Sequence, residues 1–383
     1  MTRSQRTPIV AFVGSLLAVA CGHGESAQPD LTADAVKHYA AILDANYQDT
    51  ISKMGALKTS VDAFAASPSA DGYDAMKQAW IEARIPYGQS EFSRFYGGPL
   101  DQAQGAMNEW PIDENYVDYT AGNPQGGIIN DVAQYPEITG LVLTSLTGKG
   151  GTENLATGFH ALEFLIWGQR LDQTAGPGER PYTDYVDGGT AANQDRRRAY
   201  LQTATTLLVA DMRAVEAEWH LDDPQSYGAG FVAASPVESV TKIYRGFSQM
   251  AISELYYERL SNPYRSKDRK DEESCFSEST LNDLVANAHG LENVYSGTYG
   301  SLKGASLSDL IRAKDPKLDS DLKDQLAAIR KAIEAIPDPF DHAVLADPAS
   351  DPSQKVQAAI AACKPLTDLL AQGATALGIV NNL

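Results

Sequence analysis

The sequence predicts an all-α protein made of two packed helical bundles, with long irregular loops around one buried helix. Apolar residues recur every three or four positions over most of the chain, which is the helical period. No run of alternating β-branched residues is long enough to predict a sheet. Four or more helical patterns lie on each side of about residue 235, so we predict an N-terminal bundle at 31–235 and a C-terminal bundle at 236–383.

The beginning of the chain predicts export. Arg3 and Arg6 precede a short apolar segment that ends in small residues, which is typical of a secretory signal peptide at 1–20 and too short for a retained membrane span. Cys21 follows directly, as in a bacterial lipobox, so we expect it to be lipidated and residues 21–30 to form a tether. Ordinary cleavage nearby, without a lipid, is the alternative.

Two helical patterns open the N-terminal bundle. The first covers 31–67, with Thr32 and Asp34 as candidate caps. The second covers 74–95 and contains Pro86. Because proline has no backbone N–H and its ring crowds the preceding turn, we predict that this helix ends or kinks at Pro86.

Loops and further helices follow in order. Residues 97–151 are rich in Gly, Pro, Asn and Asp, which predicts a long irregular segment of the kind that often carries function. A second loop is predicted at 169–189, and the charged segment 266–279 reads as a solvated loop. Helical patterns are also found at 193–220, 237–260, 281–288, 307–336 and 353–377.

The segment 155–168 carries the most informative chemistry, because His160 and Glu163 lie inside an otherwise apolar run. On a helix, residues three apart project from one face with Cβ atoms roughly 5–6 Å apart, within reach of one shared metal ion. A helix that is apolar nearly all round is normally buried, and a buried imidazole beside a carboxylate needs partners. The alternative is a His160–Glu163 hydrogen bond that fixes helix packing without a metal.

Charge narrows the class of partner. The formal net charge is −19, and removal of a signal peptide with its arginines makes the chain more acidic still. This argues against binding of nucleic acid and against electrostatic attachment to anionic lipid. It is compatible with gathering cations, although solubility alone also explains it.

Cysteine usage predicts a disulfide. With Cys21 consumed by lipid, Cys275 and Cys363 remain, an even number in an oxidising compartment. We therefore expect Cys275 and Cys363 to be bonded, with two buried free thiols as the alternative.

Five segments in chain order resemble the imelysin family, a group of exported or lipid-anchored bacterial proteins. The most specific segment is GFHALEFLIWG at 158–168. A His-x-x-Glu pattern alone would be weak evidence for the family, because it occurs by chance in many helices. The other four are ARIPYGQSE at 83–91, EWPID at 109–113, RPYTDY at 180–185 and SCFS at 274–277.

The resemblance implies an all-α fold of two four-helix bundles, with the motif helix near their junction. It also implies a location in the periplasm or at the outer membrane, where contact with the membrane would be through the lipid on Cys21 alone. Family members have been described both as iron-uptake components and as metallopeptidases. The implied partners are a metal ion or chelated iron and a membrane-embedded iron-uptake component, with no nucleic acid.

The residues favour metal binding over hydrolysis. The helical zinc-peptidase signature His-Glu-x-x-His supplies two imidazoles and a general base, but Ala161 follows His160 and the motif has no second histidine. Hard oxygen ligands suit iron, so we expect iron bound by His160, Glu163 and Glu91. Zinc is the alternative metal, with Glu163 as catalytic base of a metallopeptidase. A non-catalytic interaction protein with a structural His–Glu pair is the third interpretation.

Other side chains have more than one interpretation. Glu91 has a salt-bridge alternative, to Arg84 or Arg94. Asp113 and Glu82 come after it as ligand candidates, and the loop 97–151, with Glu91 at its approach, is where we expect the missing carboxylates. Trp110 and Asp113 are otherwise expected to shape that loop, as an aromatic anchor and a helix cap.

Overall fold

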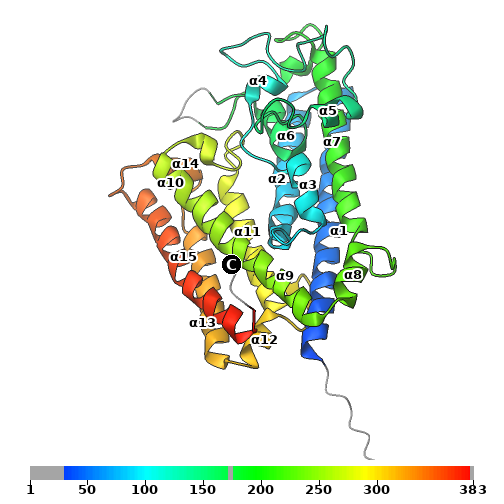
Figure 1. Ribbon diagram of the computed structural model, residues 1–383. Helices are drawn as coiled ribbons and strands as arrows, with labels where there is room; N and C mark the ends of the chain where they lie inside the picture. Colours follow the sequence, from blue (N-terminus) through cyan, green and yellow to red (C-terminus); the bar gives the residue numbers. More distant parts are fainter. Residues whose placement is uncertain (1–29, 171–175, 380–383) are drawn as a thin grey trace, which may run out of the picture. The chain divides into compact units, whose positions relative to one another are not determined.

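The structure is a computed structural model that describes residues 30–170 and 176–379 (Figure 1). The chain from Leu31 onward forms one compact unit. Its regular structure within the described residues is helical apart from one hairpin, in which β1 (Thr298–Tyr299) pairs antiparallel with β2 (Leu302–Lys303). The all-α prediction is confirmed, and the hairpin was missed because strands of two residues leave no periodic pattern.

The described part of the chain does not cover every prediction. The signal peptide at 1–20, lipidation of Cys21 and almost all of the tether lie outside the described residues. Within the described residues, no helix is both long enough and apolar enough to cross a membrane.

Three long helices form the core of the N-terminal part: α1 (Leu31–Ala66), α2 (Ala70–Ser90) and α7 (Gln194–Ala217). α1 packs against both α2 and α7. Helix α2 does not end at Pro86 as one reading of the sequence predicted, but continues for one more turn. Asn46 of α1 donates a hydrogen bond to the carbonyl of Pro86 at 3.1 Å, so packing against α1 supports this turn.

The C-terminal part is built from α9 (Pro236–Gln249), α11 (Thr280–Ser296), α13 (Pro316–Glu334) and α15 (Asp351–Ala376). Helix α9 continues without a break into η3 (Met250–Ser261), a π-helix. α11 packs against α13 on one side and against α2 on the other, while α13 and η3 both contact α15. Because α11 has neighbours from both halves of the chain, the predicted boundary near residue 235 stays a prediction.

The segment predicted as a long irregular loop contains three short helices, α3 (Pro99–Met107), α4 (Glu114–Val117) and α5 (Gly140–Leu146). Asp113 caps α4 by accepting a hydrogen bond from the backbone N–H of Asn115 at 3.0 Å, so its predicted role as a cap is confirmed. The short helices elsewhere in the described chain are α8 (Tyr227–Ala233), α10 (Asn262–Ser266), α12 (Leu307–Arg312) and α14 (Phe340–Leu345). The 3₁₀ turns are η1 (Glu91–Ser93), η2 (Tyr182–Tyr185) and η4 (Arg269–Asp271).

Helix α6 (Gly158–Trp167) carries the motif, and every residue in it is buried, as predicted. It packs against α2, α3 and α7. Gly158 begins the helix with φ +92°, and a Cβ at this position would lie 2.8 Å from the carbonyl oxygen of Met107. Glycine is therefore required here, both by its backbone conformation and by the close approach of α3.

Candidate functional site

His160 and Glu163 face one another, as their spacing predicted. The Nδ1 atom of His160 lies 3.0 Å from Oε2 of Glu163. The side chains are 1% and 0% exposed respectively. The pair is therefore a hydrogen-bonded unit in the interior of the protein.

Glu163 has a second partner that the sequence did not predict. Ser277 donates hydrogen bonds to Oε1 of Glu163 from its backbone N–H at 2.9 Å and from its hydroxyl at 2.7 Å. Both carboxylate oxygens of Glu163 are thus engaged, one by His160 and one by Ser277. Ser277 belongs to the SCFS segment at 274–277, but nothing in the spacing of that segment links it to the motif helix.

The hydrogen bond to Glu163 sets the state of the His160 imidazole. A carboxylate only accepts, so Nδ1 carries the proton and Nε2 keeps a free lone pair. Nε2 is buried and has no hydrogen-bond partner among the described residues. Burial lowers the pKa of His160 below its ordinary value, the bond to Glu163 opposes this, and the charges of Arg84 and Arg259 add to the lowering. The imidazole is consequently neutral, with one unsatisfied acceptor.

Trp110 packs on His160, as expected of an aromatic anchor. The two rings meet edge to face with centroids 4.8 Å apart. The indole Nε1 donates to the carbonyl of Lys270 at 2.6 Å, which ties the loop that carries Trp110 to the segment before α11. Trp110 also lines a cavity of about 300 Å³.

Charged side chains dominate the wall of this cavity. The π-helix η3 contributes Glu254, Glu258 and Arg259, and Arg94 and Glu273 come from other segments. π-Helical turns are rare and occur often at functional sites. The cavity therefore combines an unusual backbone with clustered ionisable groups beside the tryptophan that covers His160.

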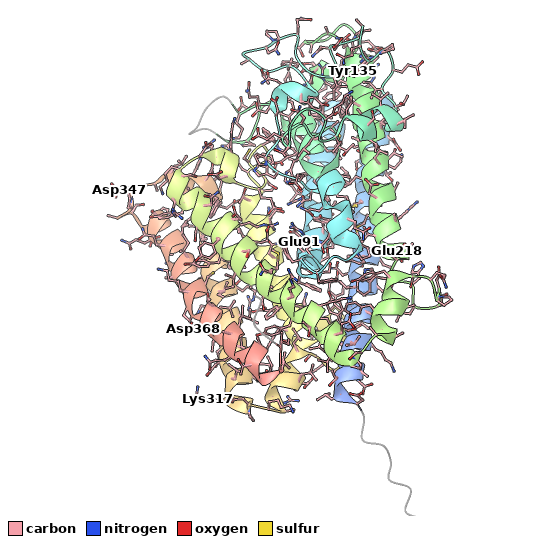
Figure 2. All side chains as sticks on the ribbon, viewed as in Figure 1. Glu91, Tyr135, Glu218, Lys317, Asp347 and Asp368 are labelled. Atoms are coloured by element: carbon pink, nitrogen blue, oxygen red, sulfur yellow. The ribbon has the colours of Figure 1, made fainter. Side chains whose placement is uncertain are left out.

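Glu91 is engaged in an ion-pair network with arginines. Its Oε2 is 2.7 Å from Nη1 of Arg259, and its Oε1 is 2.9 Å from Nη2 of Arg259 and 3.0 Å from Arg94. Figure 2 shows Glu91 where the N-terminal helices meet the long helix formed by α9 and η3. The salt-bridge alternative is confirmed for Arg94, while the main partner, Arg259, was not predicted.

The arginines explain the ionisation of Glu91. Burial alone would raise its pKa, but the guanidinium of Arg259, assisted by Arg94 and Arg84, lowers the pKa of Glu91 to about 2. The carboxylate is therefore ionised and fully engaged. Ligation of a metal by Glu91 stays a prediction, and it would require Glu91 to release Arg259.

Arg84 has other partners than the predicted Glu91. Its guanidinium pairs with Asp283 at 2.9 Å and with Glu273 at 2.8 Å. Glu273 in turn lies 3.0 Å from Arg259. These buried ion pairs connect α2, η3 and α11 directly behind the motif.

The remaining ligand candidates from the sequence lie apart from His160. Asp113 serves as the cap of α4, and Glu82 is exposed and pairs with Lys53 at 3.0 Å. The described residues do contain two groups whose three candidate ligand atoms all lie within 4.8 Å of one another. One combines Asp44, Glu216 and His220, the other Glu278, Asp341 and His342, and neither includes His160.

The predicted disulfide between Cys275 and Cys363 is wrong for this structure. Both are buried free thiols. Cys363 lies on α15, whereas Cys275 lies beside Ser277 under the motif helix. Burial raises the pKa of Cys275 well above its ordinary value and that of Cys363 to about 12, so both thiols are protonated and unreactive while the protein is folded.

Most of this chain matches a family model and a known protein. Residues 43–372 match a family model described as imelysin, which is labelled a peptidase. Iron-regulated protein A of Synechococcus elongatus is 26% identical over 297 residues, which cover 74% of this chain and 70% of that protein.

Two solved structures share the fold. A candidate iron-regulated protein A precursor from Parabacteroides distasonis is 22% identical, with a TM-score of 0.71 over 93% of this chain and 97% of that chain. An imelysin-like protein from Psychrobacter arcticum is 15% identical, with a TM-score of 0.63 over 91% and 96% of the two chains. At these identities the likeness concerns the fold alone.

Proposed function

Because this chain belongs to the imelysin family, we propose that it is an exported protein that binds a metal ion, with iron as the expected metal, in iron uptake or its regulation. One observation carries this proposal. His160 presents a buried, neutral imidazole whose Nε2 has no hydrogen-bond partner within residues 30–170 and 176–379. The name of the Synechococcus relative, iron-regulated protein A, supports iron over other metals.

The residues fit a metal-binding imidazole and its support. Metal-bound histidines commonly donate their second ring N–H to a carboxylate, which fixes the tautomer and raises the basicity of the ligating nitrogen. Glu163 occupies that position toward His160, and Ser277 holds Glu163 in place. In this proposal His160 is a direct ligand through Nε2, and Glu163, which we had expected to ligate as well, orients it. Iron is then the cargo of the protein.

The geometry gives less support to the two alternatives. A metallopeptidase would use Glu163 as general base, but both oxygens of Glu163 are already engaged. A purely structural pair accounts for the contacts of Glu163 and leaves the unpartnered Nε2 of His160 unexplained, since buried polar atoms are nearly always paired.

Metal titration of the purified protein tests the proposal. We expect His160→Gln to lose iron binding, and Glu163→Gln to weaken it roughly 10–100-fold because the imidazole loses its orienting partner. His38→Gln is the matched control, because His38 already bonds the Gly297 carbonyl through Nε2. Equal binding by wild type and His160→Gln would refute the metal hypothesis.

The same variants separate the alternatives. Cleavage of an unstructured polypeptide that disappears in Glu163→Gln would favour the metallopeptidase. A lower melting temperature in both variants, without any change in metal binding or cleavage, would favour the structural pair and an interaction protein.

The proposals for the membrane anchor and for the partner protein are based on the sequence alone. We propose attachment in the periplasm or at the outer membrane through a lipid on Cys21, and delivery of iron, bare or chelated, to a membrane-embedded uptake component. In cells that express the full chain, Cys21→Ser should move the protein from the membrane fraction to the soluble fraction. An unchanged distribution would exclude the lipid anchor.

A further inference from the structure

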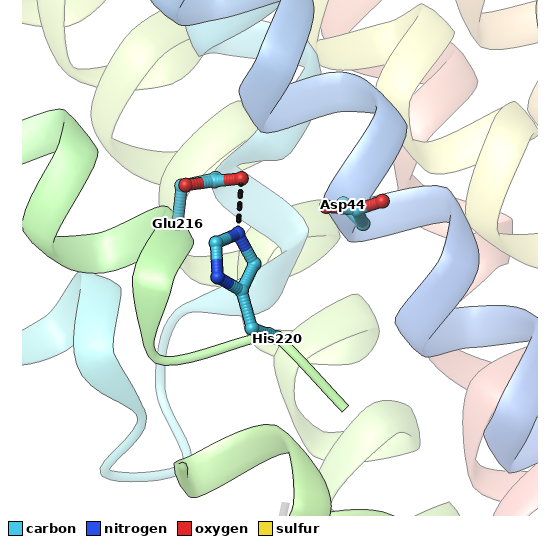
Figure 3. Close-up of side chains that lie close together, drawn as sticks. All are labelled: Asp44, Glu216 and His220. Atoms are coloured by element: carbon cyan, nitrogen blue, oxygen red, sulfur yellow. Dashed lines mark hydrogen bonds and ion pairs between the residues drawn. The ribbon is translucent and has the colours of Figure 1, made fainter. Parts of the chain in front are cut away.

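We propose that Asp44, Glu216 and His220 form a second cation site, selective for a divalent first-row transition metal ion and separate from the motif. His220 had no assigned role in the sequence. Asp44 lies on α1, Glu216 in the last turn of α7, and His220 in the segment that follows α7 (Figure 3). This proposal does not depend on the function proposed for His160.

The three side chains already converge. Their candidate ligand atoms lie within 4.8 Å of one another. Nε2 of His220 is 2.7 Å from Oε1 of Glu216, because the chain turns back beside the last turn of α7. Asp44 reaches toward them from the neighbouring helix and is steadied by Gln48, which donates to its Oδ1 at 3.0 Å. Closing around an ion would therefore need side-chain adjustment only.

A buried tryptophan beside the three residues leaves one donor without a partner. Trp219 lines a cavity of about 450 Å³ together with Asp44, His220 and Asp222. It is 1% exposed, and its indole Nε1 is a buried donor without a hydrogen-bond partner among the described residues. Such donors are rare in folded proteins.

Electrostatics favour a cation at this position. Three acidic side chains, those of Asp44, Glu216 and Asp222, lie beside His220. This concentration of acidic groups favours binding of a cation. The carboxyl end of α7 adds the negative end of a helix dipole.

The other three-residue group shows why this one is preferred. There, Asp341 already lies 2.7 Å from Arg269 and 3.1 Å from Arg170, and Arg170 also pairs with Glu278 at 2.6 Å. Two guanidinium groups thus occupy the carboxylates that an ion would need. In the described part of the chain, the hydrogen bonds and ion pairs of Asp44, Glu216 and His220 involve no lysine or arginine.

The donor set specifies the class of ion. One imidazole with two carboxylates suits Zn²⁺, Mn²⁺, Fe²⁺ and Co²⁺, whereas Ca²⁺ and Mg²⁺ prefer oxygen ligands alone. The side chain of His220 is 46% exposed, so an ion can exchange directly with solvent. We therefore expect a readily exchangeable site.

Titration of the full chain with Zn²⁺ by calorimetry and with Co²⁺ by visible absorption tests the site. We expect His220→Ala and Asp44→Asn each to weaken one binding event by at least about tenfold. The matched control is His289→Ala, which removes another exposed histidine that lies 3.7 Å from a glutamate, Glu334. This control should bind both probes like the wild type.

Two comparisons decide the outcome. The binding event must persist in His160→Gln, which separates this site from the one proposed at the motif. If His220→Ala and Asp44→Asn melt at the wild-type temperature and bind both probes like the wild type, the second site does not exist. Equal loss in His289→Ala would likewise overturn it, because binding would then be a property of exposed histidines in general.

Discussion

Ser277 is the residue through which the C-terminal half controls the motif. Its hydroxyl and its backbone N–H both donate to Glu163, but only the hydroxyl depends on the side chain. We expect Ser277→Ala to lower the free energy of unfolding by about 1–2 kcal/mol, since one hydrogen bond to a buried charged group is lost. Chemical denaturation measures this.

The same substitution should act on metal binding. Glu163 would be held less firmly, so we expect iron affinity to fall roughly tenfold. Ser145→Ala is the control, because Ser145 is exposed and its hydroxyl bonds only the Val142 carbonyl. An unchanged affinity in Ser277→Ala would mean that the backbone N–H alone positions Glu163.

Glu91 should make the stability of the protein depend on pH in the acid range. Its pKa falls from 4.5 to about 2 on folding because Arg259 outweighs the effect of burial. A carboxylate with a depressed pKa stabilises the folded state above its unfolded pKa and loses this contribution as pH falls through the folded value. We therefore expect stability to drop between about pH 4.5 and pH 2.

Glu91→Gln should remove that dependence and reveal its source. Arg259 would keep Glu273 and Glu254 as partners but lose its pair with Glu91, so the substitution should cost about 1–3 kcal/mol at neutral pH, while the acid drop becomes shallower. Glu82→Gln, which alters an exposed pair with Lys53, should change little. Equal stability curves for Glu91→Gln and wild type would exclude Glu91 as an important pair.

At the scale of the element, the start of α6 depends on a glycine. Gly158→Ala should destabilise the protein by about 2 kcal/mol or more, because alanine is strained at φ +92° and its Cβ would collide with the carbonyl of Met107. In Gly55→Ala, within α1, the new Cβ has nothing within 4 Å, and a gain of about 0.5–1 kcal/mol is expected. Thermal unfolding of both variants checks the contrast. Two shifts of the same sign would contradict it.

The long helices were predictable because their buried faces repeat at the helical period. α1, α7 and α15 begin and end within a few residues of the predicted patterns, and the burial of α6 followed from its apolar sequence. Prediction from local sequence failed where contacts with other helices determine the structure. At Pro86, for example, α2 continues past the proline because it packs against α1.

Short helices in the presumed loop were missed although two had signals at their starts. Pro99 occupies the first turn of α3, and Thr139 caps α5 by accepting from the N–H of Val142. Only part of the candidate site could be predicted from the sequence. The facing of His160 and Glu163 follows from helix geometry, but Ser277 reaches Glu163 only through the fold, across 114 positions of sequence.

At the scale of the whole molecule, buried polar contacts join the two halves. Arg84 pairs with Asp283, and Glu163 accepts from Ser277. A fragment of residues 31–235 would leave the charges of Arg84 and Glu163 without these partners. We therefore expect the fragment to lack a cooperative thermal transition, while the full chain unfolds in one step. Near-UV circular dichroism distinguishes the two.

A sharp transition in the isolated fragment would contradict that expectation. It would also establish residue 235 as a true domain boundary. Co-expression of residues 236–383 with the fragment is the matching control, since it should restore the missing partners and the cooperative transition.

The long reach of these contacts has a consequence for the folding pathway. Arg259 and Glu91 are 168 positions apart, and Arg84 and Asp283 are 199 apart. Contacts between distant positions form slowly, because a large loop must close before they become favourable. During vectorial synthesis or export, α6 emerges long before its C-terminal partners do. If His160 binds iron as proposed, its support through Glu163 and Ser277 forms late in folding, and an incompletely folded chain should bind iron more weakly.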